Sequence, residues 1–297
     1  MNLVKRFDGD EMNVFMSQSN QAKIELEEIA DVQRQVITPA LSVPIIGIVQ
    51  DGLLGAYNLS QPSMKIDWKS AMNLISYTSL DDFSAFKKDK KEYNGTELFS
   101  LIIPPRINTK KGITVENGTI KSGILSGASL GSKKPQSLIH LIWDQYGHDE
   151  TRKFIDNTQR LINNFNMWNG FSVGIGDIDV PKEVDEQLHV LFETKKLEVD
   201  HLITEMENNP DLVDPEVFEQ TIQAELGVIR ENASKLVMAH LKPNNAFLIM
   251  SESGSKGSAT NMGQMGACLG QQVVESKRIR NRYNGRALQY FFQGNEK

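Results

Sequence analysis

The stretch KEVDEQLHVLFETKKLEVDHLITEM, residues 182–206, decides the architecture of the back half of this 297-residue chain. Apolar side chains recur along it near helical spacing, so a helix formed here would have one apolar face. The segment DPEVFEQTIQAELGVIRENASKLVMAHL, residues 214–241, repeats the pattern after an Asn-Asn-Pro break at 208–210. The two segments predict an antiparallel pair of long helices, and the apolar face of the first consists of Val184, Leu188, Leu191, Leu197, Ile203 and Met206.

In front of Pro181 the chain mixes strand-like and helical patterns. Residues 37–57, ITPALSVPIIGIVQDGLLGAY, combine two prolines with β-branched runs and predict short strands and turns, not a long helix. Asn117-Gly118, between two alternating runs, predicts a β-hairpin. The predicted fold class is α+β, with a mixed strand and helix front half followed by the antiparallel helix pair, and a boundary near Pro181.

Helical patterns also occur in the front half. The pattern in residues 12–29 begins with a strand-like run and passes into a helix, and the pattern in 60–79 starts near Pro62. Residues 135–169 hold two helical patterns that are split near Gly147. The apolar sides of the first two helices are Ala22, Ile24, Leu26 and Ile29 for one, and Trp68, Met72, Leu74 and Ile75 for the other.

The composition indicates a folded globular protein and excludes several classes. A net charge of -6 gives no bulk attraction to nucleic acid, so any phosphate contact must come from local clusters. The single cysteine cannot form an internal disulfide, which favours a reducing, intracellular compartment. No signal-peptide pattern and no run of about 20 apolar residues occurs, so we expect neither secretion nor contact with a membrane.

The segment RFDGDEMN places two carboxylates two positions apart around a glycine. In an extended backbone Asp8 and Asp10 point to the same side, and Gly9 permits a tight bend between them. Two carboxylates can hold Mg²⁺ together with waters and substrate phosphates. An EF-hand is excluded because Met12 and Asn13 occupy positions that need a ligand and a glycine. From the residues alone, an exposed acidic loop, a metal site and a sugar-nucleotide transferase clamp all remain open.

A glycine-rich stretch, residues 251–272, forms the second unusual passage. Lys256 lies between Gly254 and Gly257, a flexible turn with one cation that could meet a phosphate, although the order of a Walker A loop is absent. The glycines at 263, 266 and 270 favour close packing of a helix against a neighbouring backbone. Two basic clusters could be solvated faces, and the second could also contact nucleic acid: Lys87, Lys88, Lys90 and Lys91, and then Lys277, Arg278, Arg280 and Arg282.

Other chemistries are excluded by spacing. The five histidines lack paired cysteine or carboxylate partners at zinc-ligand spacing, and one cysteine makes a structural zinc site improbable. The glycines of residues 169–177 are not in the order that dinucleotide-binding turns require, and no hydrolase nucleophile elbow occurs.

Several blocks taken together resemble one family, the largest subunit of multisubunit DNA-directed RNA polymerases of the eukaryotic and archaeal type. The blocks follow one another in the family's order and are spread over essentially the whole chain. They are FDGDEMNVFMSQS (7–19), GIVQDGLLGAY (47–57), GASLGSKKPQSLIHLIW (127–143), NGFSVGIGD (169–177), SGSKGSATNMGQMGACLGQQ (253–272) and GRALQYF (285–291).

The resemblance implies an internal fragment of the catalytic subunit. Residues 1–40 would be the end of the active-site β-barrel with its metal-binding turn. Residues 41–180 would be the pore region, and residues 181–297 the helical funnel. The implied function is template-directed RNA synthesis by nucleotidyl transfer, and the chain alone would be inactive. The implied partners are the second-largest subunit and other polymerase subunits, with DNA template, RNA product and nucleoside triphosphates. The implied location is intracellular, with the nucleus, the cytoplasm and a viral factory left open.

The resemblance also implies which residues act. Asp8 and Asp10 match two of the family's three metal-binding aspartates and would hold the catalytic Mg²⁺. Lys256 matches a lysine near the incoming nucleoside triphosphate.

The chain departs from the family's Asn-Ala-Asp-Phe-Asp-Gly-Asp motif, because Val4, Lys5 and Arg6 stand where the first three residues belong. A cation about 4 Å from a divalent ion costs several kcal/mol even at an effective dielectric of about 20. We therefore expect weak Mg²⁺ binding by this sequence as written, and we expect the remainder of the motif to be encoded elsewhere. The alternative is a non-catalytic interaction module, or polymerase remnant, that docks polymerase partners.

Overall fold

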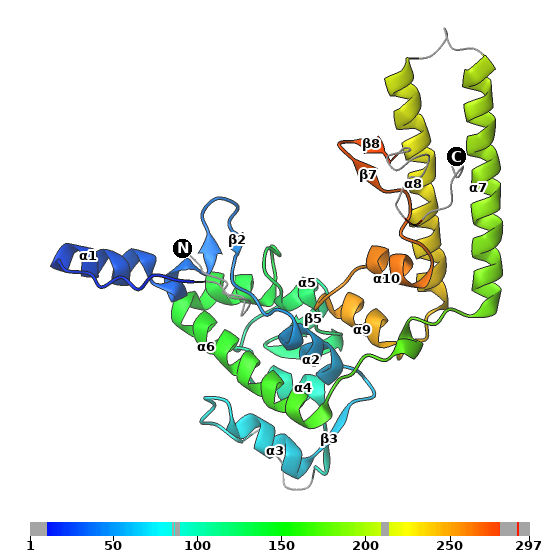
Figure 1. Ribbon diagram of the computed structural model, residues 1–297. Helices are drawn as coiled ribbons and strands as arrows, with labels where there is room; N and C mark the ends of the chain where they lie inside the picture. Colours follow the sequence, from blue (N-terminus) through cyan, green and yellow to red (C-terminus); the bar gives the residue numbers. More distant parts are fainter. Residues whose placement is uncertain (1–10, 85, 87–89, 209–213, 280–289, 291–297) are drawn as a thin grey trace. The chain divides into compact units, whose positions relative to one another are not determined.

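The computed structural model describes residues 11–84, 86, 90–208, 214–279 and 290. Asp8 and Asp10 lie outside these residues. The chain divides into two compact units (Figure 1). The front unit consists of Met1–Phe171 with Glu252–Lys256, and the back unit consists of Ser172–Ser251 with Gly257–Lys297.

The front unit combines helices with short hairpins. Its described helices are α1 (Asn20–Glu25), the π-helix η1 (Leu26–Ala30), the 3₁₀ helix η2 (Val32–Gln35), α2 (Asp51–Leu59), α3 (Trp68–Ser76), α4 (Gly95–Ser100), α5 (Gly127–Leu130) and α6 (Leu138–Asn169). Its described strands pair antiparallel as β1 (Ile37–Thr38) with β2 (Val43–Pro44), β3 (Lys65–Asp67) with β4 (Glu92–Asn94), and β5 (Ile113–Glu116) with β6 (Thr119–Gly123).

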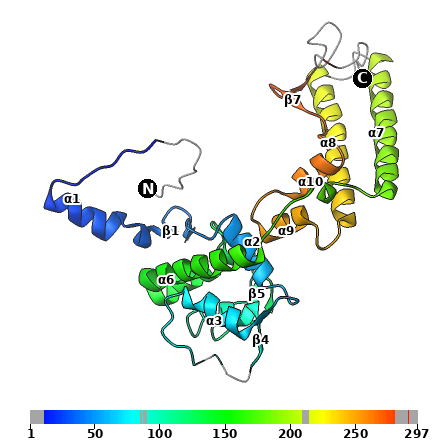
Figure 2. The same cartoon turned by 60° about the horizontal axis from the view of Figure 1, so that its bottom comes forward.

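The core of the front unit lies under α6, which packs against α2 and α3 (Figure 2). Phe99 and Phe154 meet edge to face with ring centroids 6.2 Å apart, and both side chains are buried. Such a pair adds about 1 kcal/mol to the burial of its rings. The predicted division of this helical segment is confirmed, since Gly147 has a φ of 78° and interrupts the helical backbone.

The back unit contains the predicted antiparallel helix pair, α7 (Lys182–Asn208) and α8 (Pro215–His240), which lie side by side in Figures 1 and 2. Val184 and Leu188 of α7 pack with Ala233 and Val237 of α8. The other described elements are the 3₁₀ helix η3 (Ile175–Asp177), α9 (Ala246–Ser253, whose last two residues belong to the front unit), α10 (Ala259–Gly266), β7 (Val273–Val274) and β8 (Lys277–Arg278).

The predicted α+β class is confirmed, since helices predominate and the described strands form four separate two-stranded antiparallel sheets. The predicted hairpin is also confirmed. Asn117 and Gly118 both have positive φ, 49° and 75°, as the tight two-residue loop between β5 and β6 requires. Among the described residues, no helix is both long and apolar enough to cross a bilayer.

The structure corrects four local predictions. Helix α2 lies where only strands and turns were predicted, and no strand forms in residues 12–17. Helix α3 begins at Trp68, later than predicted, because the Asp67 carboxylate caps it by accepting from the backbone N–H groups of Lys69 and Ser70. In the first helix, the predicted apolar side chains Ile24, Leu26 and Ile29 are exposed.

Candidate functional site

The turn that carries Lys256 belongs to the front unit. At its start Ser253 is fully buried, and its hydroxyl oxygen accepts from the backbone N–H of Ser255 at 3.3 Å. Gly254 follows with a φ of 75°, a conformation that strains any residue with a side chain. A Cβ added to Gly254 would also lie 3.4 Å from the Gly127 backbone. The turn therefore lies close to the segment that begins α5.

The turn closes one side of a cavity of about 850 Å³ in the front unit. The start of α2 forms a second side and the α5 segment a third. Lys256 directly follows Ser255, a lining residue, and its side chain is exposed. The lining residues are Ile48, Val49, Gln50, Leu53, Ser126, Gly127, Ala128, Gly131, Ser132, Lys134, Glu252, Gly254 and Ser255.

Charges of both signs lie at this turn: Lys256 and Lys134 are cations, and the Glu252 carboxylate, which accepts from the Tyr57 hydroxyl, also lines the cavity. Lys256 forms no ion pair with any residue that the structure describes, so its ammonium group keeps its hydrogen-bonding capacity. Lys134 contributes a second cation to the lining of the cavity. An ammonium group binds a phosphate as a compact point charge, and it can donate to the phosphate oxygens from several directions. The arrangement could bind a polyphosphate, as the sequence predicted for Lys256.

A tyrosine connects this turn to α2. The Tyr57 hydroxyl donates to the Glu252 carboxylate at 2.5 Å across a separation of 195 residues. Burial raises the pKa of Tyr57 to about 12, with the hydrogen bond to Glu252 and its negative charge as further causes, against a small opposing effect of Gln61. This contact could not be predicted from the sequence: Tyr57 ends the block at 47–57, Glu252 lies just outside the block at 253–272, and no spacing rule links the two residues.

The predicted metal ligands Asp8 and Asp10 lie outside the described residues. Elsewhere in the described part of the chain, no group of three or more His, Cys, Asp or Glu side chains is placed to hold a metal ion. The structure thus places Lys256 one residue beyond the lining of the cavity, whereas Asp8 and Asp10 lie outside the residues that it describes.

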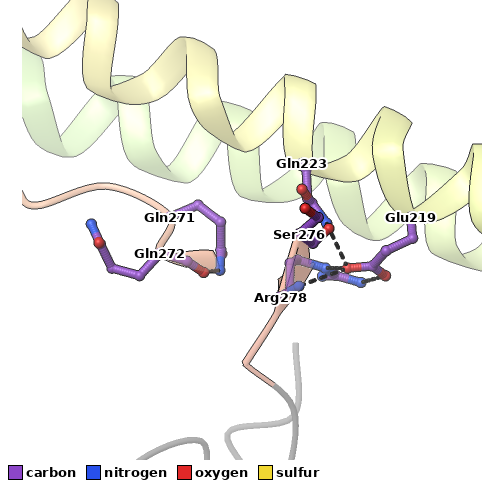
Figure 3. Close-up of polar contacts among 6 residues, drawn as sticks. All are labelled: Glu219, Gln223, Gln271, Gln272, Ser276 and Arg278. Atoms are coloured by element: carbon purple, nitrogen blue, oxygen red, sulfur yellow. Dashed lines mark hydrogen bonds and ion pairs between the residues drawn. The ribbon is translucent and has the colours of Figure 1, made fainter. Parts of the chain in front are cut away.

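The second basic cluster contains a partly buried ion pair, and this corrects both interpretations of Arg278. Its guanidinium donates to both carboxylate oxygens of Glu219 on α8, at 2.8 and 3.1 Å (Figure 3). Gln223 donates from its amide to the Ser276 carbonyl at 3.0 Å, so the β7–β8 hairpin is attached to α8 at two places. Arg280 and Arg282 lie outside the described residues.

Two family models match the chain in consecutive order. RNA polymerase Rpb1, domain 3, matches residues 35–178, and RNA polymerase Rpb1, domain 4, matches residues 200–297. The first match includes the α2 and α5 sides of the cavity, and the second includes the turn with Lys256. The chain belongs to the family of RNA polymerase largest subunits, as the resemblance implied.

Individual relatives agree with this assignment. The chain is 38% identical over 287 residues to "DNA-directed RNA polymerase subunit 1" of Acanthamoeba polyphaga mimivirus. The alignment covers 96% of this chain and 19% of that protein. It is 30% identical over 304 residues to "DNA-directed RNA polymerase II subunit RPB1-B" of Trypanosoma brucei brucei. This alignment covers 96% of this chain and 17% of that protein. The chain therefore spans about a fifth of the length of these relatives.

Proposed function

We propose that this chain is part of the catalytic subunit of a DNA-directed RNA polymerase and takes part in template-directed RNA synthesis. The observation that carries the proposal is the pair of consecutive family matches, supported by 38% identity to a viral polymerase subunit over 96% of the chain. Within this proposal, residues 1–40 contribute the end of the active-site barrel, residues 41–180 the pore, and residues 181–297 the funnel.

Each site residue has a distinct role in the proposal. Asp8 and Asp10 hold Mg²⁺, and their carboxylates are the oxygen ligands that this ion prefers. Bound Mg²⁺ stabilises the charge that develops during nucleotidyl transfer. Lys256 contacts the phosphates of the incoming nucleoside triphosphate, and its exposed position beside the cavity supports this role.

The activity depends on partners. Template-directed synthesis needs the second-largest subunit, the other polymerase subunits, the DNA template and the RNA product in place. The chain alone is therefore inactive in our proposal, and the assembled enzyme works inside the cell, in the nucleus or the cytoplasm.

The test compares polymerase assembled with wild-type and variant chains. Asp10→Ala should abolish RNA extension, and Lys256→Ala should raise the KM for nucleoside triphosphate by about 10-fold, the effect of losing one charged contact. Lys235→Ala is the matched control, because Lys235 forms only an exposed pair with Glu231 on α8. Primer extension by the isolated chain, abolished by Asp10→Ala, would refute the requirement for partners.

A second candidate function, a non-catalytic docking module, is favoured by Arg6. This arginine stands where the family has the first of its metal-binding aspartates. The docking module predicts that co-purification with the second-largest subunit survives the combined change of Asp8→Ala and Asp10→Ala. Loss of that binding would count against it. Under the catalytic proposal, Arg6→Asp should instead tighten Mg²⁺ binding, which calorimetric titration would detect.

A further inference from the structure

The contact between Tyr57 and Glu252 joins two parts of the front unit that are distant in sequence. Tyr57 lies near the end of α2, and Glu252 lies directly before the buried Ser253, at the start of the turn. Helix α2 is itself fixed in the core, since Leu53, Ala56 and Leu59 are buried in it. The hydroxyl of Tyr57 thus links the start of the turn to a helix packed in the core, through a hydrogen bond that is open to solvent.

The rest of the turn transmits this attachment to Lys256. Ser253 and Ser255 are hydrogen-bonded through their hydroxyl groups at 3.0 Å, which links the residue after Glu252 to the residue before Lys256. Gly254 also lies near the Gly127 backbone, since a Cβ added to Gly254 would be 3.4 Å from it, and this leaves little room for the turn to move toward α5. Among the described contacts, the hydrogen bond from Tyr57 restrains the first residue of the turn, Glu252, at the end away from Lys256.

We infer that Tyr57 is a positioning residue: through Glu252 it fixes the turn at 252–256 and so places the Lys256 ammonium group for the polyphosphate of a nucleoside triphosphate. The inference rests on the proposed function, because Lys256 is assigned to the triphosphate there. Tyr57 itself does not need to touch the substrate.

A positioning role follows from how a lysine binds a phosphate. The four-carbon stem is flexible, so the location of the backbone largely decides which positions the ammonium group reaches. A displacement of about 1 Å in a group that orients a substrate is enough to lower activity strongly. A turn released from α2 should therefore lose affinity for the triphosphate while the chemical step is preserved.

The decisive experiment is a double-mutant cycle in the assembled polymerase. Tyr57→Phe keeps the ring and removes only the hydroxyl, and it should raise the KM for nucleoside triphosphate by about 10-fold with little change in kcat. The same change made in the Lys256→Ala background should add nothing, because Tyr57 acts through Lys256. Glu252→Gln keeps an acceptor for the hydroxyl and should retain most of the affinity, whereas Glu252→Ala should resemble Tyr57→Phe.

Tyr146→Phe is the matched control, since the Tyr146 hydroxyl donates to the Pro105 carbonyl, away from the residues that line the cavity. It should leave KM unchanged. Amide hydrogen exchange supplies a readout independent of activity: Tyr57→Phe should speed exchange at residues 252–256, and Tyr146→Phe should not.

The contrary outcomes are distinct. Additive effects of Tyr57→Phe and Lys256→Ala on KM, or unchanged exchange in the turn of the Tyr57→Phe protein, would overturn the inference. Unchanged KM in the Lys256→Ala enzyme would refute the proposed role of Lys256 instead. In that case, the exchange measurement alone decides whether Tyr57 holds the turn.

Discussion

Glu219 and Arg278 form a two-point ion pair, in which the Arg278 Nε and Nη2 donate to the two carboxylate oxygens of Glu219 at 2.8 and 3.1 Å. Their side chains are only 15% and 13% exposed, less than both partners of any other ion pair among the described residues. The two residues are 59 positions apart in the sequence, and their contact holds the β7–β8 hairpin on α8.

Removing one partner of this pair should weaken the attachment of the hairpin. Glu219→Gln leaves the Arg278 guanidinium with a neutral acceptor, and we expect a loss of about 2 kcal/mol in the stability of the hairpin contact. Amide exchange at residues 273–278 of the full chain would measure it. Glu231→Gln breaks an exposed pair on the same helix. It should change the opening free energy obtained from amide exchange by less than about 0.5 kcal/mol. Equal effects of the two changes would contradict a special role for the partly buried pair.

Two glycines of the back unit should respond oppositely to alanine. A Cβ on Gly263 would lie 2.6 Å from the Ser234 Cα, so Gly263→Ala forces α10 away from α8 and should destabilise by about 1–3 kcal/mol. Gly227 lies within α8 with nothing within 4 Å of its added Cβ, so Gly227→Ala should stabilise the helix by up to about 1 kcal/mol. Urea unfolding of the two variants provides the test, and a stabilised Gly263→Ala protein would refute the close packing.

Asp177 should make the start of α9 sensitive to acid. The backbone N–H of Gly174, and after it that of Ala246, donates to the carboxylate and lowers the pKa of Asp177 below its ordinary 3.8. Its contribution to stability is therefore present above pH 3.8 and is lost as the pH falls through the lowered folded-state pKa. Amide exchange in α9 should accelerate over that range in the wild type. The Asp177→Asn protein should show no such acid step.

Tyr57 should lose its proton at a higher pH than an ordinary tyrosine. With its pKa raised from 10.0 to about 12, Tyr57 contributes stability that is complete below pH 10 and is lost as the pH rises toward 12. The difference in phenolate absorbance between wild type and the Tyr57→Phe protein isolates this group. Glu252→Gln should move the transition to lower pH, because a negative charge beside the phenolate disappears. A difference spectrum centred near pH 10 would contradict the contact.

The elements predicted correctly are those specified by local patterns. The α7–α8 pair follows from apolar side chains at helical spacing, and the β5–β6 hairpin follows from the positive φ that Asn117 and Gly118 adopt readily. The family assignment likewise followed from ordered sequence blocks.

Helix α2 could not be predicted in this way. Its buried residues Gly52, Leu53, Leu54, Gly55, Ala56 and Leu59 surround the helix, so no polar face gives the sequence a helical period. The Tyr57–Glu252 contact was equally inaccessible, because tertiary packing alone brings residues 195 positions apart together. The partner of Arg278 was missed for the same reason, and the cluster at 277–282 was therefore interpreted only as a solvated face or a nucleic-acid contact.

The interruption at Gly147 has an electrostatic consequence for α6. A continuous helix would carry one dipole, whereas a break in the backbone creates an additional negative end before Gly147 and an additional positive end after it. Asp149 and Glu150 fall in the first turn after the break, where each acidic side chain is favourable by about 0.3–1 kcal/mol. Acidic residues in the middle of a 32-residue segment are thus at a helix start. In terms of its dipole, α6 is two helices in succession.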